Sequence, residues 1–155
     1  MNEAEIRMAS ADDLSRIAAA YVAWGYGAGI AQEDTAWVAE MLGEIIGVVR
    51  VAPEHGALVL RGMQIAEGRR GAGIGTRLLH AVDSWLDCRT CYCIPYVHLK
   101  RFYGQIGFRE IPVPAAPSFL AVRTDSYKQR GLNVLVMMRP ASSAPLPEVR
   151  RYSET

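Results

Sequence analysis

The sequence lacks any apolar run approaching the roughly 20 residues that a membrane-spanning helix needs. Its first residues carry acidic side chains in place of the apolar core of a secretory signal, so we expect a cytoplasmic protein. It also lacks an excess of either charge, because 17 basic and 16 acidic side chains leave a formal net charge of +1. No overall field favours nucleic acid or an anionic membrane as a partner. A small molecule or a peptide is therefore the expected partner, with no nucleic acid and no membrane.

Cysteine is also scarce, and its placement excludes a disulfide framework. Cys88, Cys91 and Cys93 are an odd number of cysteines clustered within a few residues. With His98 close behind they could form a zinc site, but the separated ligand pairs typical of such sites are missing. We expect no metal, and we interpret the cysteines as small buried apolar residues of a strand. A reactive thiol is the remaining alternative.

What is present fits one globular domain. The chain has 155 residues, of which 50% are hydrophobic and 21% charged, enough to bury a core without disulfides or metals. We expect the folded domain to span residues 1–139. The tail 140–155 is rich in proline, serine and charge, and we expect it to be disordered.

Hydrophobic periodicity and turn residues predict an alternation of strands and helices. The predicted strands are 5–9, 35–41, 44–51, 57–65, 91–94, 108–113 and 133–138. The predicted helices are 11–24, 76–86, 97–105 and 118–129. Residues 25–34 form a loop or a short second helix that could border a substrate site, and 53–56 form a turn. Short links make the three strands within 35–65 antiparallel neighbours. The order predicts an α/β (or α+β) fold, a mixed sheet with helices on both faces.

The most informative stretch is 60–79, LRGMQIAEGRRGAGIGTRLL. A strand leads into a loop that contains Arg70, Gly71, Gly73 and Gly75, and an amphipathic helix follows at once. Glycines let a phosphate approach the backbone, and the helix N-terminus adds a positive dipole. The pattern therefore indicates an anion site, most naturally for a pyrophosphate. The spacing fits neither the dinucleotide fingerprint nor a P-loop; the alternatives are a simple connecting turn or another nucleotide-phosphate binder.

Two segments of the sequence carry a family resemblance. Arg70-x-x-Gly73-x-Gly75 resembles the acetyl-CoA signature (Q/R-x-x-G-x-G/A) of the GNAT acetyltransferases, and residues 102–108, FYGQIGF, resemble the family segment F/L-Y-x-x-x-G-F. The segments stand in the family's order and at about its spacing, and the resemblance spans roughly residues 5–139. It implies a mostly antiparallel central sheet of about six or seven strands. It also implies acetyl-CoA as co-substrate and transfer of an acetyl group to a primary amine by direct attack in a ternary complex.

The resemblance also implies roles for particular residues. It assigns cofactor binding to Met63, Gln64, Ile65, Arg70, Gly71, Ala72, Gly73, Ile74, Gly75 and Thr76. The loop N–H groups would hold the pyrophosphate, the strand would pair with the pantetheine arm, and the N–H of Met63 or a near neighbour would polarise the thioester carbonyl. Tyr103 matches the position that protonates the leaving thiolate.

The acceptor side is less defined. The attacking amine must lose a proton, and we prefer His98 as its base, near the predicted sheet opening, over Glu40, Glu44 and His55. Many family members carry asparagine where Tyr96 stands, which predicts a differently lined acceptor pocket. Tyr21 and Tyr26 are further candidates for substrate contact. The alternative function is a non-catalytic acyl-CoA-binding or regulatory module. The apolar strand 133–138 could be core or could pair with a second copy in a homodimer, and the acceptor and acyl chain length stay open.

Overall fold

A computed structural model describes residues 3–141 of the chain. These residues form two compact units, the first ending at Trp85 and the second beginning at Leu86. Across the described residues there are seven strands and four α-helices, with short 3-10 turns between them.

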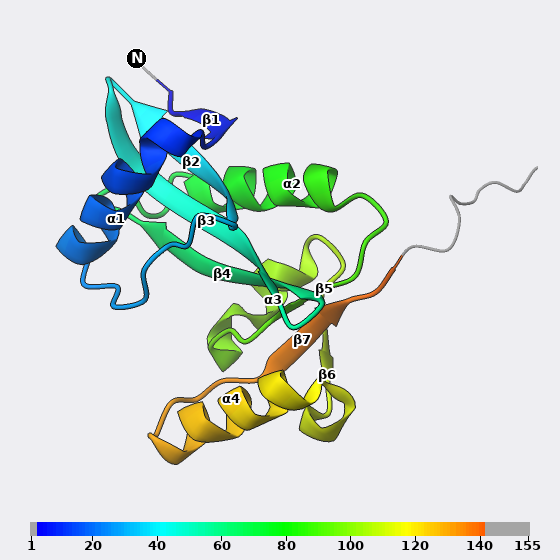
Figure 1. Cartoon of the computed structure of the whole chain (residues 1–155). Coiled ribbons are helices and arrows are strands. Elements are labelled where there is room, and N and C mark those ends of the chain that lie inside the picture. The colour runs from blue at the N-terminus through cyan, green and yellow to red at the C-terminus, as the bar shows by residue number, and fades with distance from the viewer. Residues whose placement is uncertain (1–2, 142–155) are drawn as a thin grey trace, which may run out of the picture. The chain divides into compact units, whose positions relative to one another are not determined.

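The first unit contains an antiparallel sheet of four strands in the order β1-β2-β3-β4 (Figure 1). The strands are β1 (Glu5–Met8), β2 (Thr35–Met41), β3 (Glu44–Glu54) and β4 (Ala57–Ile65). Two-residue hairpins join β2 to β3 and β3 to β4, and in both hairpins the two turn residues have positive φ. This turn geometry matches the natural twist of paired strands.

Helices cover both faces of this sheet. A 3-10 turn (Ala11–Asp13) leads into α1 (Leu14–Ala23), which packs Ile17 and Tyr21 against a face that includes Val48. The helix α2 (Ile74–Leu86) approaches the other face, where Ile74 and Leu78 both come within 3.2 Å of the Cβ position of Gly47. Gly47 and Val48 are neighbours in β3 and so point to opposite faces. The two helices therefore cover different faces, as the sequence predicted.

The end of β3 corrects one prediction. The turn expected at 53–56 is wrong in its first half, because β3 continues through Pro53 and Glu54 and only His55 and Gly56 form the turn. Pro53 pairs with Leu58 of β4, whereas the pairing of β3 with β2 ends at Val51. Proline lacks an N–H, and it is tolerated in a strand where one side has no neighbour.

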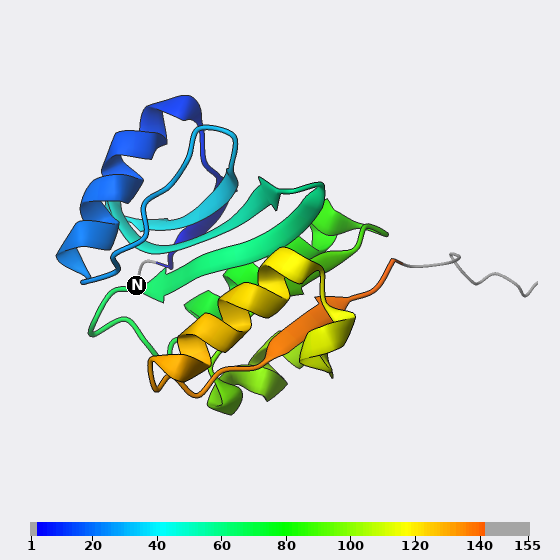
Figure 2. The same ribbon diagram turned by 60° about the horizontal axis from the view of Figure 1, so that its bottom comes forward.

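The second unit contains a three-stranded antiparallel sheet in the order β5-β7-β6. Its strands are β5 (Cys91–Cys93), β6 (Arg109–Ile111) and β7 (Val136–Arg139), and its helices are α3 (Lys100–Gly104) and α4 (Ser118–Gln129). Figure 2 shows α4 lying along β7. Because β7 pairs on both sides and is largely buried, the apolar segment predicted over 133–138 is core in this unit.

Most predicted elements are present, with shifted ends. The predictions for 35–41, 57–65 and 118–129 are confirmed to the residue. Residues 25–34 form a loop and contain no helix. The predicted helices 11–24 and 97–105 each begin with a 3-10 turn, and α2 begins two residues before the predicted start. The predicted strands 5–9, 91–94 and 108–113 are shorter than expected, and 133–138 is shifted toward the C-terminus.

The predicted fold class is confirmed as an α/β fold whose strand pairs within each unit are antiparallel. Among residues 3–141 no helix is both long and apolar enough to cross a membrane. Of the tail predicted for 140–155, all but the first two residues lie outside the described part of the chain. The assignment of residues 1–139 to one domain stays a prediction.

Candidate functional site

The glycine-rich segment is an exposed loop between β4 and α2. Gly68, Gly71 and Gly73 have φ of 87°, 87° and 80°, a conformation that side chains rarely adopt. No heavy atom lies within 4 Å of the Cβ position of any of the three. The loop therefore presents bare backbone to its surroundings, as an anion-binding loop requires.

The start of α2 supplies donors to the same place. The first helical hydrogen bond at this end runs from Arg77 N–H to the Gly73 carbonyl at 3.1 Å, so the N–H groups of Ile74, Gly75 and Thr76 precede it. Such groups and the helix dipole favour an anion. Arg69 and Arg70 are exposed beside them, and Arg70 Nε donates to the Ile65 carbonyl at 3.3 Å, which ties the loop back to β4. The geometry fits a diphosphate.

A β-bulge interrupts β4 just before this loop. Val48 pairs with Gln64 and Arg50 pairs with Arg61, so one more residue of β4 than of β3 lies between the two pairs. A bulge disrupts the ladder locally and leaves backbone groups free for other partners. The predicted donor, the N–H of Met63, belongs to this irregular segment, together with Gly62.

Tyr21 holds the bulge from the α1 side. Its hydroxyl donates to the Gly62 carbonyl at 2.7 Å, and Gly62 has a φ of 69°. A Cβ on Gly62 would collide with the Tyr21 hydroxyl, so only glycine fits. Tyr21 is 1% exposed, and its burial raises the pKa of the phenol well above the ordinary value. The phenol therefore stays protonated and remains a donor over the whole physiological pH range.

This position corrects the prediction for Tyr21. The sequence suggested substrate contact for Tyr21 and Tyr26, but Tyr21 is buried in the core. Tyr26 packs against its ring, with the ring centroids 4.6 Å apart. The role of Tyr21 toward Gly62 was missed, because no sequence pattern links a helix residue to a bulge 41 positions away.

The two predicted catalytic residues lie in the second unit. Tyr103 is buried in α3, with its ring edge-on to Phe102 at 4.9 Å and to Phe108 at 6.1 Å between centroids. His98 is exposed and its ring stacks on Tyr96 at 5.9 Å. The structure thus gathers the ten predicted cofactor residues in one continuous segment of the first unit, and places Tyr103 and His98 in the second.

The other candidate bases are less suited to the role. Glu40 accepts hydrogen bonds from Arg16 and Arg7, at 3.1 and 3.0 Å, and these lower the pKa of its carboxyl below the ordinary range. A carboxylate held in this way is a weak base. Glu44 and His55 are exposed at the two hairpins of the first unit.

Two of the three cysteines are small core residues, and the prediction of a buried strand position is wrong for Cys88. Cys91 and Cys93 are buried in β5, and Cys88 is exposed. Burial raises the pKa of the Cys93 thiol well above its ordinary value, which disfavours the reactive thiolate. Within residues 3–141 no group of three or more His, Cys, Asp or Glu side chains is placed to hold a metal ion.

A buried ion pair in the first unit was also missed. Arg50 of β3 is 3% exposed at its side chain and its Nη1 lies 3.5 Å from Asp34, which is 4% exposed. The available signal was a single arginine inside the apolar run EIIGVVRV. A charged residue in such a run is seldom buried unless it is paired or has a function.

Comparison with known families gives a match that includes the glycine loop and α3. The model described as "Acetyltransferase (GNAT) domain" matches residues 32–110, slightly more than half of the chain. The match contains both segments of the predicted resemblance. No protein of curated function matches the sequence significantly.

Solved structures resemble the chain in fold at low sequence identity. ElaA of Escherichia coli is 16% identical with a TM-score of 0.64, covering 88% of this chain and 99% of its own. An N-acetylglutamate synthase from Neisseria gonorrhoeae, complexed with coenzyme A and N-acetyl-glutamate, is 18% identical with a TM-score of 0.63, covering 92% of this chain and 36% of its own. An aminoglycoside 6'-N-acetyltransferase complexed with coenzyme A is 17% identical with a TM-score of 0.59, covering 86% and 95%.

Proposed function

The chain belongs to the GNAT acetyltransferase family, and on this basis we propose that it transfers an acetyl group from acetyl-CoA to a primary amine. The observation that carries the proposal is the bulged β4 running directly into a glycine loop and the first N–H groups of α2. The acceptor is a small molecule or a peptide, and attack occurs directly in a ternary complex. The cytoplasm remains the compartment expected from the sequence.

The first unit supplies the cofactor-binding groups. The N–H groups from Arg70 to Gly75 bind the pyrophosphate, and Thr76 completes the first turn of α2. The strand Met63–Ile65 pairs with the pantetheine arm as an added strand would. The Met63 N–H donates to the thioester carbonyl as its oxygen becomes negative, which is often the largest single catalytic effect in acyl transfer.

The second unit supplies the proton-transfer groups. His98 takes a proton from the acceptor ammonium, so that the neutral amine can attack the thioester carbon. Attack forms the N–C bond and leaves the negative charge on the carbonyl oxygen. The C–S bond then breaks, Tyr103 gives its proton to the leaving thiolate, and the second proton of the acylated nitrogen restores the phenol. Both roles rest on the sequence: Tyr103 on its match to the family segment, and His98 on its place near the predicted sheet opening.

Calorimetric titration of acetyl-CoA tests the cofactor site. We expect the native protein to bind and a Gly73→Glu variant to lose binding, because the new carboxylate would repel the pyrophosphate. Gly43→Glu is the matched control, since Gly43 also has a positive φ (78°) and open space around its Cβ position, at the β2–β3 hairpin. Failure of the native protein to bind would overturn the proposal.

A screen of amines that follows free thiol separates the enzyme from its alternative. We expect turnover with at least one amine, and a loss of about 100-fold in Tyr103→Phe with unchanged affinity for acetyl-CoA. Binding of acetyl-CoA without turnover of any amine would instead identify a non-catalytic acyl-CoA-binding module. One observation favours the non-catalytic module: exposed Tyr96 stands where many family members have asparagine.

A further inference from the structure

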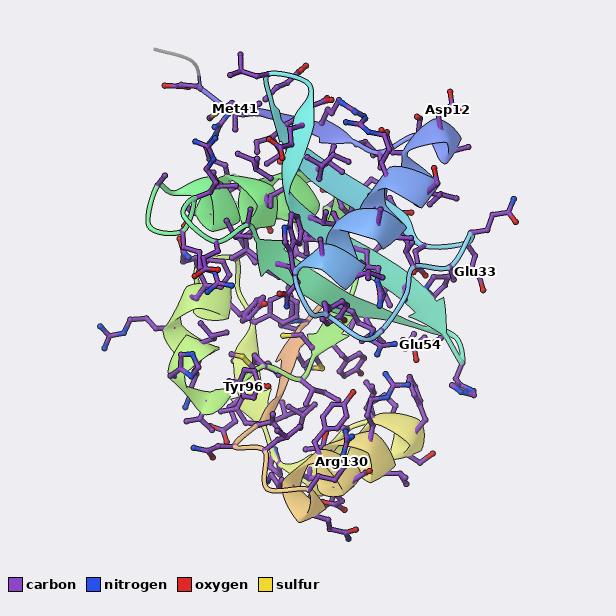
Figure 3. All side chains as sticks on the ribbon, turned by 90° about the vertical axis from the view of Figure 1, so that its left-hand side faces the viewer. Asp12, Glu33, Met41, Glu54, Tyr96 and Arg130 are labelled. Atoms are coloured by element: carbon purple, nitrogen blue, oxygen red, sulfur yellow. The ribbon has the colours of Figure 1, made fainter. Side chains whose placement is uncertain are left out.

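The first unit contains a hollow on the α1 side of β3 and β4. It has a volume of about 290 Å³ and lies between the loop after α1 and the hairpin ends of β3 and β4. Its lining includes five charged side chains: Glu33, Asp34, Arg50, Glu54 and Arg61. Figure 3 labels Glu33 on the loop and Glu54 at the hairpin, at the same end of this unit. This volume is at the lower limit of ordinary ligand pockets, so it suits a small ligand.

Two arginines face each other in this pocket. Arg50 and Arg61 are direct partners in the β3–β4 register, and both line the hollow. Like charges directly opposite each other on neighbouring strands repel, which destabilises the pair unless anions lie close by. Asp34 is 3.5 Å from Arg50, and Glu54 is 3.3 Å from Arg61. Both contacts are longer than the 2.7–2.9 Å of strong charge-assisted hydrogen bonds.

Arg50 retains unused donor capacity. A guanidinium carries five N–H donors, and a buried one is costly unless they are satisfied. The Nε of Arg50 is buried with no hydrogen-bond partner among the described residues, and its Nη1 has only the long contact to Asp34. Asp34 is itself shared, because it also accepts from the Ala31 N–H at 3.0 Å. Arg50 therefore has a deficit of acceptor oxygens, whereas Arg61 has Glu54 beside it.

The pocket is also beside the proposed reaction centre. Arg61 immediately precedes Gly62, and Met63, whose N–H we assign to the thioester carbonyl, follows one residue later. An anionic group held by Arg50 and Arg61 would thus bind within two residues of the donor along the same strand.

We propose that this pocket binds the carboxylate of the acceptor, and that the acceptor is a small amine that carries a carboxylate, such as an α-amino acid. This inference rests on the proposed function. The two arginines bind the carboxylate from both strands, in the bidentate manner that a guanidinium favours. The deficit of acceptors at Arg50 is then filled by the ligand.

The experiment compares each common L-α-amino acid with its carboxamide, which keeps the amine and the side chain but lacks the negative charge. Calorimetry on protein saturated with CoA gives the affinity of each probe, and thiol release from acetyl-CoA gives KM. We expect at least one amino acid to bind, with an affinity at least tenfold above that of its amide. KM should likewise be lower for the amino acid than for its amide.

Arg61→Gln is the test variant, because Arg61 is 27% exposed at its side chain and its removal leaves the buried Arg50 in place. We expect this variant to reduce the preference for the acid over the amide at least tenfold, with unchanged affinity for acetyl-CoA. Arg109→Gln, which removes one exposed arginine from β6, is the matched control and should change neither quantity. Arg50→Lys, which keeps the charge but loses the fork of donors, should weaken acid binding in the same direction.

Several outcomes would overturn the proposal: no amino acid binds, acids and amides bind equally, or Arg61→Gln tightens binding of a polycation such as spermidine. Because binding is measured without turnover, these outcomes are distinguishable from failure of the proposed function. If acetyl-CoA does not bind or no amine is acetylated, that function fails, while the comparison of acids with amides on the protein alone still decides whether the pocket takes a carboxylate.

Discussion

At the scale of single residues, the bulge in β4 depends on one contact from outside the sheet. Tyr21 reaches from α1 to the Gly62 carbonyl at 2.7 Å, and the guanidinium carbon of Arg50 lies 6.0 Å from the centre of its ring. A carbonyl and the following N–H share one rigid peptide plane. Fixing the Gly62 carbonyl therefore also fixes the direction of the Met63 N–H. Tyr21 is in this sense a positioning residue for the proposed donor.

Replacing Tyr21 with phenylalanine should lower kcat more than it changes cofactor binding. The variant keeps the ring but loses the hydroxyl, so the peptide plane before Met63 is less firmly held. Removing a donor from an oxyanion site costs about 100-fold or more in kcat, and a misdirected donor should cost less, about tenfold. The free energy of unfolding should fall by about 1 kcal/mol for the lost hydrogen bond. Steady-state kinetics and acetyl-CoA titration measure both effects.

Tyr26→Phe is the control for that prediction, because it removes a hydroxyl from the ring packed against Tyr21 and leaves the contact to Gly62 intact. Equal loss of kcat in both variants would contradict a positioning role.

The sequence could indicate the glycines of the loop, since their spacing is a recognisable pattern. It could not indicate Tyr21 or Arg50, whose partners are set by the tertiary register of α1, β3 and β4.

At the scale of elements, a network of charges joins the first four elements of the chain. Asp13 in the 3-10 turn accepts from Arg7 of β1 at 2.7 Å and from Arg16 of α1 at 3.1 Å. Glu40 of β2 binds the same two arginines. The Ser10 N–H also donates to Asp13 at 2.8 Å. The network therefore fixes the start of α1 against β1 and β2, far along the chain from the glycine loop.

The network should make the stability of the protein depend on pH in acid. The hydrogen bond from Arg7, followed by that from the Ser10 N–H, holds the pKa of the Asp13 carboxyl well below its ordinary value of 3.8. A carboxyl whose pKa is lower in the folded state contributes stability above its unfolded pKa, and loses it as the pH falls toward the folded pKa. The free energy of unfolding should therefore decrease as the pH falls below about 4.

Asp13→Asn should reduce the free energy of unfolding at pH 7 by about 2 kcal/mol, the usual size of a hydrogen bond to a charged group. Its deficit relative to the native protein should narrow as the pH falls below about 4. Urea unfolding at a series of pH values measures this. Asp12→Asn is the control, because Asp12 is exposed and points away from the start of α1 (Figure 3). A deficit that stays constant with pH would contradict the assignment.

The elements themselves were predictable where the local pattern is strong. The short apolar run in TAWVAEM and the glycine after the 118–129 helix indicate those elements without tertiary information. The sequence was misleading at Pro53, because a proline ends a central strand but not a strand that has lost one neighbour. The bulge at Gly62 was missed for a related reason: an extra residue in one strand is defined only by the partner strand.

At the scale of the whole molecule, the near-neutral charge and ordinary composition restrict the class of partner but not its identity. The two resembling segments identified the family and indicated the loop that we propose for the cofactor, since both are short and contiguous in sequence. The carboxylate pocket was not predictable, because its five charged residues come from a loop and two strand ends, and residues of that kind are usually solvated. The identity of the acceptor therefore depends on residues that only the folded chain brings together.

Acetyl-CoA should stabilise the folded chain by mass action, and this gives a test at the level of the whole molecule. A ligand at 100 times its dissociation constant adds about 2.7 kcal/mol to the free energy of unfolding. For a chain of this length, that corresponds to a rise in Tm of about 5–10 °C. We expect this rise for the native protein and for Tyr103→Phe, because the role we propose for Tyr103 is to protonate the leaving thiolate and not to bind acetyl-CoA. Gly73→Glu should show no rise at the same concentration. Scanning calorimetry measures all three, and an equal rise in Gly73→Glu would mean that acetyl-CoA binds somewhere other than the glycine loop.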